Sequence, residues 1–423
     1  MVTVGGNITA AEEASVGELI ADGAIRAVYQ PIVDLDTGEV VAYEALARGP
    51  RGSELEMPGR LFPEAGRLGL LAQLDREARG AAIRGAIASD LADPTSLFVN
   101  VEPSSLDAGG PLIDGEDEIR RHGLRIVVEF TERELAARPA DVLRAVAWLR
   151  ARGWGIALDD IGADRRSLAL LPFLAPDVLK LDMGLVQQDT VSRSTAHVVN
   201  AVAAEAERSG ALVLAEGIET DAHLNRARAF GARLGQGWLF GRPGELPAGG
   251  APAGAGISVR RGDEGIPTGT PFNALAEGAP LRTGTKRVLL ALSRQLEAEA
   301  EALSAESVVL ATFQEASFFT PITRKRYERL ARGSALVGAL GVGMDSIPAP
   351  GVRGGQIAPD DPLRGEWDVV VISPHFAGAF VARDLGSRGA DLDREFEFSM
   401  SYDRDLVLQA ARMLLERVVP SAS

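Results

Sequence analysis

The first half of the chain alternates between two kinds of segment. Short apolar runs rich in β-branched residues are followed by longer segments in which alanine, leucine and arginine recur at helical spacing, as in "ADVLRAVAWLRARG" (140–153) and "STAHVVNAVAAEAERSG" (194–210). This rhythm predicts repeated strand–helix–strand units and therefore a parallel sheet. About eight strand candidates within about 230 residues match the size of a (β/α)8 barrel of the TIM type. We therefore expect the α/β class, with a barrel as the first domain.

The start of this domain has a different pattern. The apolar segments "AIRAVYQPIVDL" (24–35) and "VVAYEALAR" (40–48) are joined by the short polar sequence "DTGE". Two strand-like runs separated by a few turn-forming residues predict a β-hairpin. We therefore expect the first strand of the barrel to be antiparallel to its neighbour.

A change of composition divides the chain. Residues 247–271, "PAGGAPAGAGISVRRGDEGIPTGTP", are rich in Gly, Pro and Ala, show no periodicity, and are typical of a flexible or extended linker. We expect a flexible N-terminus over residues 1–15, the barrel over 16–246, and a second, smaller α/β domain over 272–420. In the second domain, "KRVLLALSRQLEAEAEALS" and "SYDRDLVLQAARMLLERV" have the pattern of helices, whereas "SVVLATFQ", "ALVGALGV" and "WDVVVISP" are strand-like.

Charge and composition narrow the range of functions. The chain has 423 residues, of which 46% are hydrophobic and 24% charged, as in globular proteins. Its net charge of −15 argues against binding to nucleic-acid polymers, which requires a basic surface. The absence of cysteine excludes disulfides and thiolate metal sites. Because no apolar stretch reaches the ~18 residues of a membrane span and no signal-peptide pattern opens the chain, we expect a cytoplasmic protein with no membrane contact.

Polar side chains recur where the expected strands end. In a parallel barrel these ends meet on one face, where active sites are built. Seven successive strands carry such residues at this point: Glu44, Asn100, Glu129, Asp159 with Asp160, Lys180, Glu216 and Gln236. A single polar strand end is usually a turn or a helix cap, but seven that converge on one face indicate a site.

The residue types in this set favour divalent cations. Carboxylate and amide oxygens suit Mg²⁺ or Mn²⁺. The adjacent Asp159 and Asp160 repel each other unless positive charge lies close by, and two cations would supply it. Two such ions about 4 Å apart are a device that hydrolyses phosphodiesters. Lys180 is also open to interpretation as a Schiff-base lysine, but that role needs a lowered pKa and the nearby carboxylates would raise it.

The chain resembles the EAL-domain phosphodiesterases, which linearise cyclic di-GMP to pGpG. The matching motifs occur in family order and cover nearly all of residues 25–243: "YQPIVDLDTGEVVAYEALAR", "FVNVEPSSL", "VVEFTERE", "ALDDIGAD", "VLKLDM", "LAEGIET" and "LGQGWLFGRP". The resemblance implies a (β/α)8 barrel with one antiparallel strand and two Mg²⁺ or Mn²⁺ ions in each active site. It also implies cyclic di-GMP as the ligand.

The resemblance further implies a role for each matching position. The ligands of one metal would be Glu44, Asn100, Glu129 and Asp159, and those of the other Asp159 and Asp160. The groups that activate water would be Lys180 and Glu216. The substrate contacts would be Gln30, Arg48 and Gln236, with Arg48 at a phosphate. The supports of the loop after Asp160 would be Glu132 and Glu219.

Two stretches depart from the family pattern. After Arg48 the chain reads "GPRGSELEMP", where the family has Trp and a His-Pro pair. After the twin aspartates it reads "IGADRRSL", so that Asp164, Arg165 and Arg166 replace a glycine, a tyrosine and a serine. We expect the two arginines to bind Glu132, Glu219 or an acid of a partner and to hold the loop in one position.

The same loop, residues 161–177, continues into a markedly apolar segment. Its large apolar residues exceed what a free loop should expose: Leu168, Leu170, Leu171, Phe173 and Leu174. The resemblance implies that this surface helps to form a homodimer interface through the barrel. We expect the second domain to alter activity by changing how two barrels pair.

The second domain resembles the DICT sensory domain. The resemblance rests on "ATFQEASFFTPITRKRYERLA" and "GEWDVVVISPHFAGAFVARD" and implies a sensor of a signal that the sequence does not identify. Three functions remain open: a cyclic di-GMP phosphodiesterase regulated by this sensor, a receptor that binds cyclic di-GMP without turnover, and a scaffold that acts through protein partners while its barrel is inert. The complete set of acids favours the first.

Overall fold

The structure is a computed structural model that describes residues 15–91, 93–102, 116–162, 165–247, 256–260, 268–303, 306–387 and 390–421. In the first domain, eight strands close into a barrel in the order of the sequence. They are β1 (Arg26–Asp34), β2 (Val40–Arg48), β3 (Ser96–Asn100), β4 (Arg125–Thr131), β5 (Gly155–Ile161), β6 (Val178–Leu181), β7 (Leu212–Ala215) and β8 (Leu234–Gln236). Strand β1 is antiparallel to both β2 and β8, and the other neighbours are parallel. The expected barrel and its antiparallel first strand are therefore confirmed.

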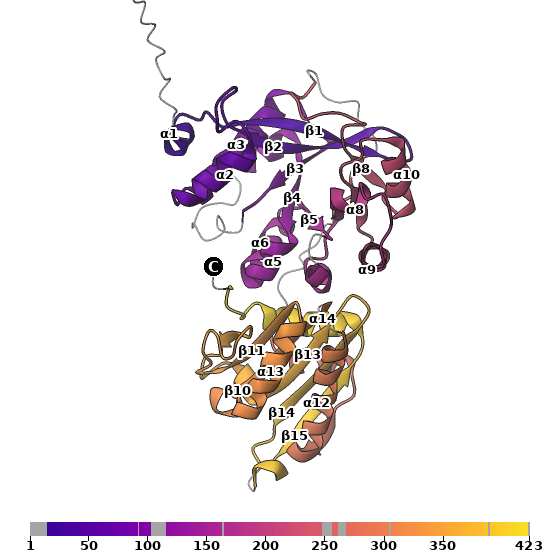
Figure 1. Ribbon diagram of the computed structural model, residues 1–423. Coiled ribbons are helices and arrows are strands. Elements are labelled where there is room, and N and C mark those ends of the chain that lie inside the picture. Colours follow the sequence, from indigo (N-terminus) through magenta and orange to yellow (C-terminus); the bar gives the residue numbers. More distant parts are fainter. Residues whose placement is uncertain are drawn as a thin grey trace, which may run out of the picture.

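The helices of the first domain lie on the outside of the barrel (Figure 1). They are α1 (Val16–Ala21), α2 (Pro58–Arg67), α3 (Leu71–Ala88), α4 (Glu116–His122), α5 (Glu132–Ala137), α6 (Pro139–Arg150), α7 (Leu171–Leu174), α8 (Met183–Val186), α9 (Arg193–Ser209) and α10 (Asp221–Ala229), with a 3₁₀ turn, η2, over Arg165–Leu170. Their boundaries follow local signals. Ser192, for example, accepts a hydrogen bond from the amide of Thr195 at the start of α9, and Gly210 ends the same helix in the left-handed conformation.

An apolar layer fills the interior of the barrel. Each of the eight strands contributes at least one buried side chain to it, among them Ile32, Ala42, Phe98, Val127, Ala157, Val178, Leu214 and Leu234. Such layers of inward-pointing side chains make a TIM-type barrel a packed core rather than a pore. This layer is the floor above which the polar residues of the strand ends lie.

The second domain is a mixed sheet covered by helices. The sheet has the order β12-β11-β10-β13-β14-β15-β9, in which β10, β11 and β12 are parallel and the other neighbours antiparallel. Its strands are β9 (Arg282–Thr285), β10 (Val308–Glu315), β11 (Leu336–Val342), β12 (Arg353–Gln356), β13 (Glu366–Ile372), β14 (Ala377–Asp384) and β15 (Glu395–Ser401). Its helices are α11 (Pro271–Gly278), α12 (Lys286–Leu303), α13 (Pro321–Gly333) and α14 (Arg404–Leu415), with 3₁₀ turns η4 (Ala316–Phe318), η5 (Pro362–Gly365) and η6 (Asp391–Asp393). The expected second α/β domain is therefore confirmed.

Alternation along β10 shows how the two faces of this sheet are covered. Val309 and Ala311 pack in one apolar cluster with α12 and α13. Val308 and Leu310 pack in another with α11 and α14. Because successive side chains of a strand point to opposite faces, the helices form two layers, one on each side of the sheet.

The helix α14 also joins the second domain to the barrel (Figure 1). The guanidinium of Arg412 donates hydrogen bonds to the carbonyl oxygens of Phe173 (3.1 Å) and Pro172 (3.2 Å), both in α7. Side chains of α14, α7 and the barrel helices belong to one continuous apolar cluster. The two domains are thus packed against each other through the segment that follows the twin aspartates.

This packing corrects one expectation about the loop at 161–177. Its five large apolar side chains are fully buried inside a single chain, where η2 contacts α5 and α9 and α7 contacts α6 and α14. Their apolar character is therefore explained without a second copy of the chain. Homodimer formation stays a prediction.

Part of the expected flexible linker is also packed. Ile257 is fully buried in the apolar layer inside the barrel, and Val259 packs against it. The amide of Arg260 donates a hydrogen bond of 2.9 Å to Asp177. Residues 256–260 are therefore packed against the barrel, which agrees with the extended form of the expected linker rather than the flexible one. Among the described residues, no helix is both long and apolar enough to cross a membrane.

Candidate functional site

A polar layer lies directly above the apolar one inside the barrel. On β2 to β8, each member of this polar layer stands two positions further along the chain than the apolar residue of the same strand. These members are Glu44, Asn100, Glu129, Asp159, Lys180, Glu216 and Gln236. A step of two residues returns a side chain to the same face of a strand, so both layers point inward. Because β1 runs in the opposite direction, its member, Gln30, comes two positions before Ile32. The eight strands together place eight polar residues at one end of the barrel.

Lys180 is at the centre of this layer. Its side chain is fully buried, and its Nζ lies 2.6 Å from Glu129 Oε1, 2.9 Å from Glu216 Oε1 and 3.0 Å from Asp159 Oδ1. Glu44 Oε1 is further away, at 3.9 Å. One ammonium group therefore faces four carboxylates contributed by four other strands or strand ends.

The buried charges shift one another's protonation. Burial by itself lowers the pKa of the Lys180 ammonium, but the four carboxylates outweigh burial and raise that pKa well above its usual value. Burial raises the pKa of Glu129 well above the ordinary range, although Lys180 opposes this effect. Burial also raises the pKa of Glu216, although the nearby Lys180 ammonium acts to lower it. A lysine held charged in this way is unsuited to Schiff-base chemistry, which needs a neutral amine.

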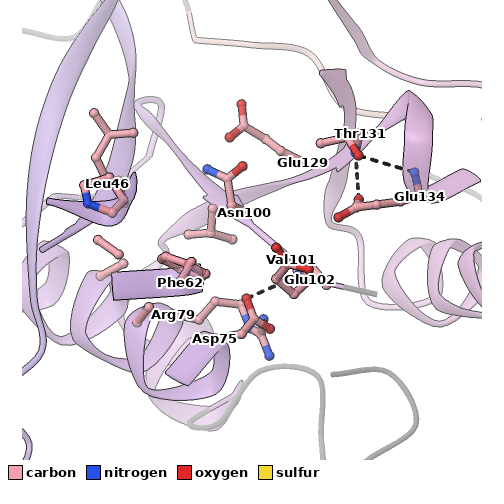
Figure 2. A pocket seen from close by; sticks show the side chains of 16 residues that line it. Leu46, Phe62, Asp75, Arg79, Asn100, Val101, Glu102, Glu129, Thr131 and Glu134 are labelled. Carbon is pink, nitrogen blue, oxygen red and sulfur yellow. Dashed lines mark hydrogen bonds and ion pairs between the residues drawn. The ribbon is translucent and has the colours of Figure 1, made fainter. Parts of the chain in front are cut away.

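Amide side chains extend the network around Glu44. Gln236 donates a hydrogen bond of 2.6 Å to Glu44 Oε2, and Asn100 donates one of 3.4 Å to Glu44 Oε1. Gln236 Nε2 also donates a hydrogen bond of 3.3 Å to the side-chain oxygen Oε1 of Gln30, and Gln30 Nε2 donates to the backbone carbonyl of Gly241. Figure 2 shows Asn100 beside Glu129, its partner on the neighbouring strand β4. The two glutamines expected to contact a substrate therefore lie at one side of the acidic cluster.

The backbone turns sharply at the second of the twin aspartates. Asp160 has φ of 58°, in the left-handed region, and its amide donates a hydrogen bond of 2.9 Å to Asp159 Oδ1. Burial and the neighbouring Asp159 raise the pKa of Asp160. One oxygen each of Asp159, Asp160 and Glu216 lies within 4.8 Å of the others, which is a spacing suited to a shared cation. Hard oxygen donors alone make up this set, so the residues fit Mg²⁺ or Mn²⁺.

The remaining predicted residues have different surroundings. Arg48 ends β2, where its guanidinium donates to the carbonyl of Ala47 and burial lowers its pKa. Glu219 is exposed, and its amide donates to His223. The side chains of Glu132, Arg165 and Arg166 lie outside the described residues, as does all of Asp164. The roles assigned to all of these residues stay predictions.

A second group of acids adjoins the site and was not expected from the sequence. A cavity of about 240 Å³ reaches from Asn100 and Glu129 to Asp75 on α3, Glu102 after β3 and Glu134 on α5 (Figure 2). The amide of Glu102 donates a hydrogen bond of 3.2 Å to Asp75. Burial raises the pKa of Glu102, and Asp75 adds to this effect. The period of two that links Phe98 and Asn100 continues to Glu102, and this signal was available in the sequence.

Comparison with known proteins supports the domain assignment. The model of the EAL domain matches residues 13–243, and the model described as "Sensory domain in DIguanylate Cyclases and Two-component system" (DICT) matches residues 273–385. The chain is similar to an uncharacterized protein of Mycobacterium tuberculosis (32% identity over 231 residues, 53% of this chain and 37% of the relative). It is also similar to the cyclic di-GMP phosphodiesterase RocR of Pseudomonas aeruginosa (31% identity over 246 residues, 56% of this chain and 62% of RocR).

Among solved structures, the chain is similar to Klebsiella pneumoniae BlrP1 in a manganese and cy-diGMP complex. The identity is 31%, the TM-score is 0.47, and the match covers 52% of this chain and 56% of BlrP1. In each of these three comparisons the chain spans less than two thirds of the other protein.

Proposed function

Because the chain belongs to the EAL domain family, we propose that its barrel hydrolyses cyclic di-GMP to linear pGpG with the help of two divalent cations. One observation carries this proposal: the barrel gathers four carboxylates around the buried ammonium of Lys180, next to Asp160. Such a concentration of buried charge is costly for folding and points to function rather than to stability. A relative that is 31% identical carries the name of a cyclic di-GMP phosphodiesterase.

The oxygen donors divide between two cation positions. Glu44, Asn100, Glu129 and Asp159 would hold one Mg²⁺ or Mn²⁺, and Asp159 and Asp160 the other. When bound, such ions lower the pKa of water and stabilise negative charge on the phosphate. Their positive charge would also offset the repulsion among the carboxylates.

The other residues of the polar layer would orient the reactants. Lys180 and Glu216 would flank the attacking water and hold it in line with the scissile P–O bond. Gln30 and Gln236 would contact the nucleotide, and Arg48 would bind one of its phosphates. One water is consumed and one P–O bond is broken, which opens the ring to the linear dinucleotide.

We also infer that the second domain regulates the barrel. Arg412 of α14 is bonded to the carbonyls of α7, and α7 is joined through η2 to the end of β5, which carries Asp159 and Asp160. A shift of α14 would therefore be transmitted to the aspartates. Regulation of this kind needs a coupling free energy of only ~1–3 kcal/mol. Replacing Arg412 with glutamine in the full chain should change the rate of hydrolysis, whereas replacing the exposed Arg324 should not.

The function is tested by incubating the full chain with cyclic di-GMP and Mg²⁺ or Mn²⁺ and separating the products by chromatography. The expected product is pGpG, and the Glu44→Gln variant should form none, while a variant at Glu299, an exposed glutamate on α12, should match the wild type. Saturable binding of cyclic di-GMP without any product would instead indicate the receptor function. Neither binding nor product would favour the scaffold.

A further inference from the structure

A cavity rich in arginine lies between the two domains. It has a volume of about 370 Å³ and is bounded by the end of α9, by residue 260, by α7 and by α14. Its charged lining consists of Arg208, Arg260, Arg404, Arg412, Glu205 and Asp405. Four arginines and two acids thus line the cavity, in a chain whose net charge is −15. Figure 1 shows α9 and α14 on facing sides of the boundary between the domains.

The arginines come from three separate segments and are held in place. Arg404 donates hydrogen bonds to the carbonyls of Ser373 (3.0 Å) and Phe376 (3.4 Å). Arg260 donates to the carbonyl of Ser209. Because these side chains are already ordered by backbone carbonyls, a ligand would lose less of its binding energy to fixing them.

Positive charge in the cavity is only partly neutralised. Arg208 pairs with Glu205 at 2.6 Å, and Glu205 is itself almost fully buried. Arg404 is bonded to carbonyls, and its Nε is buried with no hydrogen-bond partner among the residues that the structure describes. Burial lowers the pKa of Arg404 to about 10, and the nearby Arg208 adds to the effect. Like charges that are brought together in this way favour an anion between them.

We propose that this cavity is a binding site for a small anion that carries a phosphate group. Guanidinium forks match phosphate oxygens in geometry and charge. Arginines that approach from three segments suit a tetrahedral phosphate, whose oxygens point in several directions, better than a planar carboxylate. The volume lies near the lower end of the ~300–1,000 Å³ that is typical of small-molecule sites. The proposal is independent of hydrolysis in the barrel, because none of its residues belongs to the polar layer.

Binding is measured by titration calorimetry on the full chain in EDTA, so that cations cannot mediate binding in the barrel. The probes are inorganic phosphate, pyrophosphate, guanosine monophosphate and succinate. We expect at least one phosphate compound to bind once per chain with Kd below ~1 mM. A Kd of ~1 mM corresponds to a standard free energy of binding of about −4.1 kcal/mol. Succinate should bind at least about tenfold more weakly.

Variants locate the site. Arg404→Gln and Arg208→Gln should each weaken binding at least about tenfold, whereas Arg67→Gln should not change it. Arg67 is the matched control because it forms the same kind of i,i+3 pair, with Glu64, on the distant helix α2. Glu44→Gln should also bind normally, which separates this site from the barrel. Arg208 is partly exposed, so its variant tests the proposal even if the Arg404 variant does not fold.

Three results would overturn the proposal. The first is that no phosphate probe shows saturable binding at concentrations up to ~10 mM, which is about ten times the upper limit of ~1 mM expected for Kd. The second is binding that both arginine variants retain. The third is binding of succinate as tight as that of the phosphate probes, which would show that the cavity does not select phosphate.

Discussion

Replacing Lys180 with alanine tests the electrostatic basis of the site. The change removes an ammonium whose Nζ lies 2.6, 2.9, 3.0 and 3.9 Å from four carboxylates and whose side chain is wholly buried. Without it, the carboxylates in the metal-free protein keep their mutual repulsion and lose their shared partner. Removing one partner of a buried ion pair typically costs 3–5 kcal/mol, so we expect the free energy of unfolding to fall by about that amount.

This loss should be visible as a lower melting temperature of the barrel. For a domain of 150–250 residues, 1 kcal/mol shifts Tm by about 2–4 °C, so the expected decrease is about 6–20 °C. The assay is differential scanning calorimetry of the full chain in EDTA. Addition of Mn²⁺ at about 100 times its Kd should raise the free energy of unfolding of the variant by ~2.7 kcal/mol, because the cation binds only the folded state. There it would replace the missing positive charge.

Lys325→Ala is the matched control, because Lys325 is an exposed lysine on α13. Surface charges of this kind contribute at most about 1 kcal/mol, so its Tm should hardly change. A Lys180→Ala protein that loses less than ~1 kcal/mol in EDTA would refute the reasoning. It would mean that the four acids do not depend on the ammonium for their stability.

Further predictions concern the cations, their ligands and a neighbouring acid. Hydrolysis should stop in EDTA and be inhibited by Ca²⁺, which is larger and takes 6–8 ligands in loose geometry, so robust turnover in EDTA would exclude the two-metal proposal. Glu44→Ala and Asp159→Ala should abolish hydrolysis while circular dichroism shows a folded barrel, because each removes one of several like charges; near-normal rates would contradict the assigned roles. Burial raises the pKa of Glu134 to about 9. The folded protein therefore keeps the proton of Glu134 at pH values where the unfolded chain has lost it, so the stability that Glu134 contributes is full below the ordinary pKa of a glutamate and is lost as the pH rises toward 9. Glu134→Gln should therefore raise Tm more at pH 8 than at pH 5. The control is Glu18, a capping-box glutamate whose pKa is lowered by hydrogen bonds from Ser15, and Glu18→Gln should lower Tm at pH 8; equal shifts for the two variants would refute the assignment.

The polar layer shows how far local pattern reaches. Phe98 and Asn100, like Val127 and Glu129, are two residues apart on one strand, so the sequence itself places each pair on one face. Closing the strands into a barrel then brings the second members together. The same period would have identified Glu102 beside Asn100, but the sequence does not show that Asp75 on α3 packs against it.

The sequence by itself determined the barrel, its antiparallel first strand and the inward face on which the acids lie. These features follow from the spacing of apolar and polar residues within single strands and helices, which is a local property. Only the tertiary structure decided that Lys180 has four acidic partners, that Ile257 packs inside the barrel, and that Arg412 binds a carbonyl 240 positions earlier in the chain. Contacts of this kind join segments whose local patterns are independent of each other. Such contacts depend on how whole elements pack, and the order of neighbouring residues does not determine that packing.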